Sequence, residues 1–351
     1  MSTPFLELRQ VTKRFGSRLA LDSIDLDVAP GELLVVLGPT GAGKTTLLRA
    51  ICGLGSPDAG TIRMQGRDLA QLSPAQRDVA LVFQNFSLYP DWSVRRNLEF
   101  PLRSPQHSLP ESEIAERVAR AAATLRIESL LDRPAKKLSG GEMQRVAIGR
   151  AIVRKPRLYL MDEPLTNLDA KLRESLRVEL SVLVRSLGVP MIYVTHDQNE
   201  ALSMADRIAV LIEGKLQQVG TPRVVYARPI SPLVASQLGQ PQINLFEATL
   251  LGDAWCTLDG TQLAKASTTT ATRARLGVRP EHLEVLASEA LAPGRAAQVE
   301  LVENSGPNQV LVTHWAGQRV HVLTDRSREF HVGDRLGLQV AAGRAVVWPS
   351  V

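Results

Sequence analysis

A glycine-rich loop, GPTGAGKTT at residues 38–46, directly follows the apolar run LLVVL at 33–37. Glycine leaves the backbone amides uncovered and permits positive φ, so a loop of this composition can wrap closely around an anion. The spacing matches the pattern G-x-x-x-x-G-K-[ST], and the next residues, TLLRAICGL, suit a helix. The segment therefore predicts a strand, a phosphate-binding loop and a helix, in that order.

The pattern also predicts what the side chains of this loop do. Lys44 should reach the β and γ oxygens of a nucleotide, and the Thr45 hydroxyl should bind Mg²⁺, while backbone amides at the helix start hold the phosphates. An accidental match is the alternative interpretation, and the strand and helix context argues against it. The predicted nucleotide-binding residues of the loop are Gly38, Pro39, Thr40, Gly41, Ala42, Gly43, Lys44, Thr45 and Thr46.

A second acidic segment, LYLMDEP at 158–164, supplies what such a site still needs. Asp162 is placed to hold Mg²⁺ through the hydration shell of the ion. Glu163 is placed to orient or deprotonate the attacking water. Two adjacent acids at the end of a strand can also be an ordinary loop start. The glycine-rich loop upstream favours the catalytic interpretation.

Short continuous apolar runs recur along the first 235 residues, at 33–38, 79–84, 158–163, 191–196 and 208–215. Runs of this kind are typical of strands buried on both faces, as in a parallel sheet flanked by helices. A leucine stripe predicts a helix over 171–187. Another helix is predicted over 108–125, where Ser108 and Glu111 would form a capping box.

After a Pro- and Gly-rich stretch near 220–242 the pattern changes to alternating segments such as AQVELVE and NQVLVTHW. These predict a small antiparallel barrel or sandwich. A chain of 351 residues is also long for a single core. We therefore expect an α/β P-loop nucleoside triphosphatase domain at 1–235, with a helical insertion at about 88–155, followed by a smaller all-β domain at 236–351.

Composition excludes several other classes. Aromatic residues make up only 4%, which argues against a base-stacking surface, and a net charge of +5 spread along the chain is typical of a solvated surface. We expect no nucleic-acid partner. Cys52 and Cys256 lie far apart without a CxxC motif, so neither a disulfide framework nor a zinc site is indicated. No secretory signal and no apolar window of about 18 residues occurs, so any membrane role requires partners.

The segment KKLSGGEMQRVAIGRA at 136–151 places a second anion-binding helix start in the same chain. Together with LVFQ, DEPLTNLD and VTHD, in this order along the chain, it resembles the ATP-binding cassette (ABC) family of transporter ATPases. The resemblance implies that ATP is sandwiched between the glycine loop of one subunit and the LSGG segment of another, hence a homodimer. The signature residues acting on partner-bound ATP would be Leu138, Ser139, Gly140, Gly141 and Glu142.

The same resemblance implies further site residues. Gln84 would touch the metal, His196 would face the γ-phosphate as the switch histidine, and Asp169 would lie at the subunit interface. With Glu163, these are the expected catalytic residues. Phe15 occupies the place of the adenine-stacking aromatic, although taken alone it could equally belong to the core.

Two positions depart from the family pattern. Glu142 stands where glutamine is commoner, which adds a negative charge near a bound polyanion and is expected to change ATP affinity or the rate of closure. Thr166 replaces the commoner serine, which is a smaller change.

The segment NFSLYPDWSVRRNLEF after Gln84 corresponds to the stretch that, in family importers, receives a short cytoplasmic helix of the membrane subunit. Leu88, Tyr89 and Pro90 are the candidate docking residues, and an ordinary surface loop is the alternative. GQPQINLF at 239–246 and LGVRPEHL at 276–283 look like parts of the regulatory domain of carbohydrate-importer ATPases of the maltose and glycerol-phosphate type. In that group the domain has an oligonucleotide-binding-like barrel fold.

The resemblance implies an ATP-hydrolysing importer subunit that uses ATP and Mg²⁺ at the cytoplasmic face of the inner (plasma) membrane. Its partners would be two membrane-spanning permease subunits and an extracytoplasmic solute-binding protein. A polyamine, sulfate or iron importer is the runner-up. ABC ATPases of DNA repair carry long coiled coils and those of translation carry two cassettes, and this sequence has neither.

Overall fold

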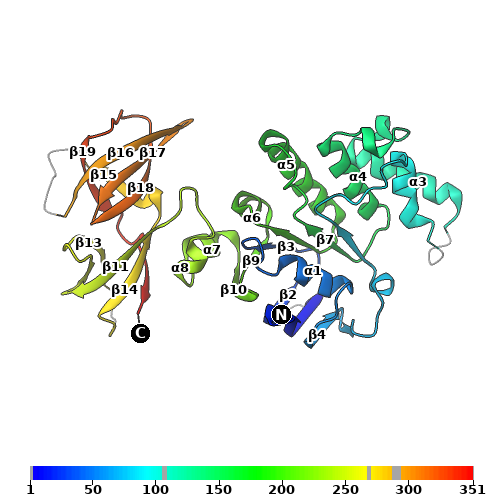
Figure 1. The fold of residues 1–351 in the computed structure, drawn as a ribbon, viewed down its shortest axis with the longest axis horizontal. Coiled ribbons are helices and arrows are strands. Elements are labelled where there is room, and N and C mark those ends of the chain that lie inside the picture. The colour runs from blue at the N-terminus through cyan, green and yellow to red at the C-terminus, as the bar shows by residue number, and fades with distance from the viewer. Residues whose placement is uncertain (1–2, 105–108, 267–269, 287–293, 351) are drawn as a thin grey trace. The chain divides into compact units, whose positions relative to one another are not determined.

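The computed structural model describes residues 3–104, 109–266, 270–286 and 294–350. The chain divides into two compact units, Met1–Pro222 and Arg223–Val351 (Figure 1). The nucleotide-site motifs all lie in the first unit.

A mostly parallel sheet forms the centre of the first unit. Strands β3, β7 and β8 are buried along their whole length, as expected for strands covered on both faces. Adjacent strands of this sheet run parallel, except that β10 pairs antiparallel with β9 at the edge. Within the described residues the strand order is β10 (Lys215–Gly220), β9 (Arg207–Ile212), β3 (Leu33–Leu37), β8 (Met191–Thr195), β7 (Leu158–Asp162) and β6 (Val79–Val82).

Helix α1 (Lys44–Cys52) follows β3 through the glycine loop and packs against the same sheet. It begins after Gly43, whose φ is 108°, and ends before Gly53, whose φ is 85°. Both values lie in the left-handed region that favours glycine, so the two glycines set the length of the helix.

An antiparallel sheet, not predicted from the sequence, shares the hydrophobic core with α1. Its strands are β2 (Arg18–Val28), β1 (Leu6–Phe15), β4 (Ala59–Met64) and β5 (Arg67–Asp68). Irregular pairing interrupts β1 against β2 at three points. These interruptions break the alternation of apolar and polar residues that would have predicted the strands.

Helices cover the rest of the unit. Three of them, α2 (Val94–Glu99), α3 (Glu111–Leu125) and α4 (Gly140–Ile152), form an insertion between β6 and β7 (Figure 1). Helix α5 (Ala170–Leu187) follows β7, and α6 (Gln198–Met204) follows β8. The 3₁₀ turns of the described chain are η1 (Pro74–Arg77), η2 (Phe100–Leu102), η3 (Glu128–Leu130), η4 (Ala135–Lys137) and η5 (Pro280–His282).

Two local predictions need correction. Helix α3 begins at Glu111, with Pro110 at its N-cap and no side-chain cap, so the start predicted at 108 is too early. The predicted capping box falls on Ser108, which lies outside the described residues. The run predicted as one strand at 208–215 ends at Ile212. Glu213 and Gly214 then adopt φ of 48° and 77°, which turns the chain back into β10.

The second unit begins with α7 (Pro222–Ala227) and α8 (Pro232–Ala235) and continues as two antiparallel sheets around one apolar core. In the described residues one sheet has the order β13 (Gln262–Lys265), β12 (Ala254–Cys256), β11 (Asn244–Leu251), β14 (Arg273–Val278), β20 (Val346–Pro349). The other has the order β15 (Leu283–Leu286), β19 (Arg335–Val340), β16 (Ala296–Ser305), β17 (Asn308–Trp315), β18 (Gln318–Asp325).

The buried Arg279 explains why the first compact unit ends at Pro222 and the second begins at Arg223, ahead of the predicted domain boundary. Its guanidinium donates to the carbonyl oxygens of Tyr226, Ala235 and Leu238, so the two short helices fold with the β sheets. A functional boundary at 235/236 stays a prediction. No helix of the described chain has both the length and the apolar character that crossing a membrane requires.

Arg77 gives the fold a test. Its side chain is 5% exposed and donates to the carbonyl oxygens of Ala50 and Ile51 at the end of α1, and to that of Leu72. Arg77→Met should lower the free energy of unfolding by about 3 kcal/mol, because three buried acceptors lose a charged donor. Urea unfolding measures the loss. Arg67→Met, on the exposed β5, is the matched control and should change little; equal effects of the two variants would contradict the assignment.

Candidate functional site

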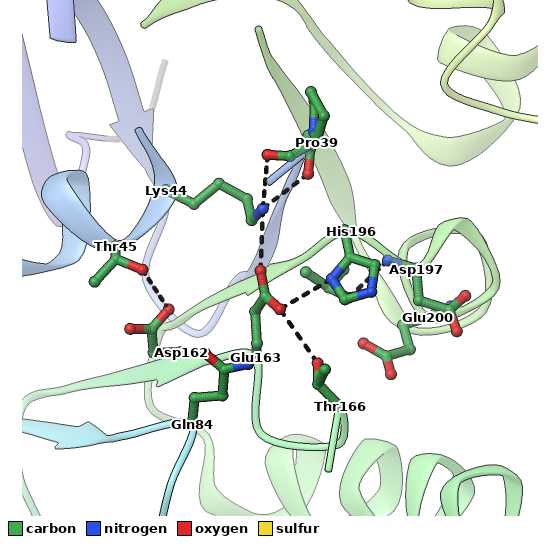
Figure 2. A network of polar contacts seen from close by, with 12 residues as sticks. Pro39, Lys44, Thr45, Gln84, Asp162, Glu163, Thr166, His196, Asp197 and Glu200 are labelled. Carbon is green, nitrogen blue, oxygen red and sulfur yellow. Dashed lines mark hydrogen bonds and ion pairs between the residues drawn. The ribbon is translucent and has the colours of Figure 1, made fainter. Parts of the chain in front are cut away.

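A cavity of about 560 Å³ opens at the carboxyl ends of β3, β7 and β8. Figure 2 shows the polar network around it, in which side chains from the three strand ends converge. Its lining residues are Phe15, Arg18, Ala20, Thr40, Gly41, Gly43, Lys44, Thr45, Thr46, Gln84, Glu163, Thr166 and His196. Ten of the residues predicted from the sequence thus meet in one place, and three of the thirteen were not predicted: Arg18, Ala20 and Thr166.

The backbone of the glycine loop leaves no room for side chains at two positions. A Cβ on Gly38 would clash with the carbonyl oxygen of Leu211, and a Cβ on Gly43 would clash with that of Ala20. Glycine at both positions therefore lets the loop lie close to β9 and β2. Ala42, a residue of the same loop, is also buried.

Lys44 is 4% exposed, and its ammonium contacts three oxygen atoms. It donates to the carbonyl oxygens of Gly38 at 2.8 Å and Pro39 at 3.1 Å, and lies 3.0 Å from Glu163 Oε1 (Figure 2). A buried lysine needs such partners to keep its charge. The lysine therefore links the loop after β3 to the end of β7.

Glu163 joins three side chains of the cavity. Besides Lys44, its carboxylate contacts His196 Nδ1 at 2.9 Å and accepts a hydrogen bond from Thr166 Oγ1 at 3.3 Å. Burial raises its pKa, but the hydrogen bond and charge of Lys44 and the contact with His196 outweigh burial and lower it overall. The carboxylate is therefore ionised at neutral pH, as a base or a water-orienting group requires.

Asp162 ends β7 beneath the cavity rather than lining it. Thr45 Oγ1 donates to its carboxylate at 3.0 Å, so the two residues expected to hold a metal already touch. Burial raises the pKa of Asp162, and the Glu163 charge adds to that rise, whereas the Thr45 hydrogen bond opposes it. A cation at this position would relieve both effects.

His196 follows β8 and is held by the backbone on both sides. The carbonyl oxygen of Thr195 accepts from Gly38 N at 3.2 Å, which ties this strand end to the glycine loop. Asp197 caps α6 by accepting from the amides of Asn199 and Glu200. The side chain between these anchors is partly exposed and reaches Glu163.

Gln84 and Phe15 complete the cavity from other segments. Gln84 lies just past β6, and its carbonyl oxygen accepts from Asn167 Nδ2 at 2.9 Å. Phe15 is 58% exposed at the end of β1, so the alternative that it belongs to the core is wrong. An exposed ring beside a phosphate loop is free to stack on a base.

The signature segment lies outside this cavity, as does Asp169, which caps α5 through Leu172 N. Ser139 is exposed and Leu138 is buried. A Cβ on Gly141 would come within 2.7 Å of the Leu172 side chain, so with any other residue at this position Leu172 of α5 would have to shift.

Glu142 turns back onto the start of its own helix. Its carboxylate accepts from Ser139 N at 2.7 Å, while Ser139 Oγ accepts from Glu142 N at 3.4 Å, which is a reciprocal capping box. Arg133 lies 3.5 Å away. The Ser139 amide hydrogen bond, with help from Arg133, lowers the pKa of Glu142. The charge is thus partly balanced within the chain, and its effect on ATP affinity stays a prediction.

An aromatic cluster, which we define as Tyr89, Trp92 and Phe100, occupies the candidate docking stretch. The Tyr89 and Trp92 rings stack with centroids 4.2 Å apart, and Phe100 meets both edge-on. Tyr89 and Phe100 are 37% and 44% exposed. The buried Asn97 fixes this loop by bonding both backbone groups of Tyr89, while Pro90 is exposed and Leu88 is half-buried.

The fold and the cavity define a P-loop nucleoside triphosphatase. The family model described as "ABC transporter" matches residues 21–166, and that described as "TOBE domain" matches 276–348. The chain belongs to the ABC transporter family, as one of its ATP-hydrolysing proteins.

Among relatives, the sn-glycerol-3-phosphate import ATP-binding protein UgpC of Chromohalobacter salexigens is 43% identical, over 98% of this chain and 94% of its own length. The UgpC protein of Ralstonia nicotianae is 42% identical, over 96% and 94%. Among solved structures, the dimeric post-hydrolysis ATP-binding cassette MJ0796, bound to ADP and Pi, matches with a TM-score of 0.56 and 30% identity. That match covers 62% of this chain and 99% of that one.

The capping box provides a second test. Glu142→Ala should lower the free energy of unfolding by about 1 kcal/mol, because the Ser139 amide loses its acceptor. Glu142→Gln keeps an acceptor oxygen and should stay near wild type. Urea unfolding compares the two variants. If glutamine destabilised the protein as much as alanine does, the cap would not be what Glu142 contributes.

Proposed function

We propose that this chain is the ATP-hydrolysing subunit of a binding-protein-dependent importer for glycerol phosphate or another carbohydrate derivative. The observation that carries the proposal is its identity of 43% with a glycerol-phosphate import ATP-binding protein over nearly the whole of both chains. The match extends through the second unit, which ABC ATPases of other kinds need not share.

The site residues divide the chemistry among them. Loop amides and the ammonium of Lys44 hold the phosphates, and the Phe15 ring stacks on adenine. The ionised Glu163 orients the attacking water and accepts its proton, and His196, which contacts Glu163, faces the transferred phosphate. Binding of nucleotide then competes with Glu163 for Lys44, since the ammonium already contacts three oxygen atoms.

Magnesium fits the donor set of this site. Mg²⁺ in nucleotide sites keeps one or two protein ligands and takes the remainder from phosphate and water. Thr45 and Asp162 are a hydroxyl and a carboxylate already in contact, with Gln84 lining the same cavity. No cluster of three His, Cys, Asp or Glu side chains suited to a metal occurs in the described residues. Bound Mg²⁺ would neutralise charge on the phosphates.

Two copies of the chain should act together. Ser139, the N-cap of α4, and its neighbours in the signature segment are not among the residues that line the cavity of their own chain. In a symmetric pair each signature segment would complete the other copy's site, so both sites would be equal. The dimeric state of the related cassette MJ0796 supports this arrangement.

The aromatic cluster is the proposed contact with the membrane subunits. The aromatic rings, in a loop fixed by the buried Asn97, are flanked by the guanidinium groups of Arg96 over Trp92 and Arg150 over Tyr89. Together they make a partly apolar, positively charged surface that suits a short helix. Two permease subunits and an extracytoplasmic solute-binding protein would complete the importer. The ATPase would then sit peripherally at the cytoplasmic face of the inner membrane.

Glu163→Gln tests the hydrolytic role. The variant should bind ATP at least as well as wild type, because the amide keeps the shape and frees Lys44, while steady-state hydrolysis should fall by about a thousandfold. Phosphate release and equilibrium ATP binding are measured side by side. Glu174→Gln, on the exposed surface of α5, is the matched control. Undiminished turnover would remove Glu163 from its role.

Affinity purification of the tagged chain from gently solubilised membranes tests the transport assignment. Wild type should recover two polytopic membrane proteins, and Tyr89→Asp should recover several-fold less while keeping its ATP binding, because a charge would be placed in an apolar contact. Recovery of ribosomes or DNA-repair proteins instead would leave the ATPase chemistry intact and overturn the importer assignment.

A further inference from the structure

Arg18 lines the nucleotide cavity, although no motif of the sequence pointed to it. It is the first residue of β2 and pairs directly with Phe15, the last residue of β1, across a two-residue turn. The hairpin therefore places a cation and an exposed ring side by side at one edge of the cavity.

The guanidinium of Arg18 rests on the phosphate-binding loop. Its Nη2 donates to the carbonyl oxygen of Gly41 at 2.8 Å. Gly41 has a φ of 82°, and a Cβ there would lie 3.3 Å from Nη2, so the glycine gives the guanidinium its close approach. The hairpin and the loop, 23 residues apart in sequence, are joined by this bond.

Most donors of this guanidinium remain available. An arginine side chain has five N–H donors, and one is used here. In the described part of the chain no carboxylate lies within ion-pair distance of Arg18. An unpaired guanidinium beside an anion-binding loop suits a phosphate group, and with Nη2 already bonded to Gly41 it suits a contact with one of the phosphate oxygens.

We propose that Arg18 is a further nucleotide-binding residue that contacts the α-phosphate of the bound nucleotide. In the proposed site the adenine stacks on Phe15 and the terminal phosphates lie at Lys44, so the nucleotide runs past the hydrogen bond between Arg18 and Gly41. Of the three phosphates, the α-phosphate is the one nearest the base and hence nearest Arg18. This inference rests on the proposed ATPase function. It adds a second cation to the site, at the opposite end of the triphosphate from Lys44.

Binding and turnover of the full-length chain separate this role from simple bracing of the loop. Arg18→Ala should weaken ATP and ADP binding by about tenfold and raise KM similarly. The kcat should stay within about twofold, because Glu163 and His196 are untouched. Arg18→Lys keeps the charge without the fork and should fall between the two. Arg14→Ala removes a cation from the same hairpin outside the cavity and should match wild type.

The two diastereomers of ATPαS provide a readout that a bracing role would not move. A contact with one α-oxygen predicts that wild type prefers one diastereomer and that Arg18→Ala loses most of that preference. An equal preference in both proteins, or an unchanged KM in Arg18→Ala, would overturn the proposal. Failure of the proposed function itself would look different, since wild type would then not bind or hydrolyse ATP in the same assays.

Discussion

The buried ammonium of Lys44 is the contact on which the rest of the site depends. A lysine this deeply buried requires oxygen partners, and it finds them in two loop carbonyls and in Glu163. Glu163 in turn contacts His196. The ends of β3, β7 and β8 are thus joined through one cation and one carboxylate, at the edge where parallel strands bring their carboxyl ends together. Gly38 and Gly43 matter because they let the loop before Lys44 lie close to β9 and β2.

The central sheet was predictable because its strands are buried on both faces. Continuous apolar runs form these strands at residues 33–37, 158–162 and 191–195. Such runs can be recognised without any alternation of apolar and polar residues. The antiparallel sheet of β1, β2, β4 and β5 was not predictable in this way. Its pairing is interrupted, so neither strict alternation nor a continuous run marks it in the sequence. The turn at Glu213 and Gly214 was not predicted, because the continuous apolar run before it does not mark where the strand ends.

Site residues were predictable where the chemistry is local. The glycine loop, Asp162 and Glu163 carry their roles within a few neighbouring residues, whereas Arg18 depends on a hairpin register and on a bond to Gly41 across the fold. Glu142 is a different case. The spacing of Ser139 and Glu142 is that of a capping box, so the sequence alone could have predicted that the Glu142 carboxylate folds back onto the start of its helix.

The separation of the cavity from the signature segment supports the proposal that two copies of the chain act together. Lys44, Glu163 and the exposed ring of Phe15 all line the cavity of one copy. The start of α4 is absent from that lining, because neither its N-cap Ser139 nor Gly140 is among the lining residues. In the proposed pair, donors that arrive only with the second copy would bind the nucleotide at closure, so nucleotide binding would draw the two copies together. Gly141 lies against the Leu172 side chain of α5, so in such a pair the helix start of α4 and the segment after Glu163 would move together.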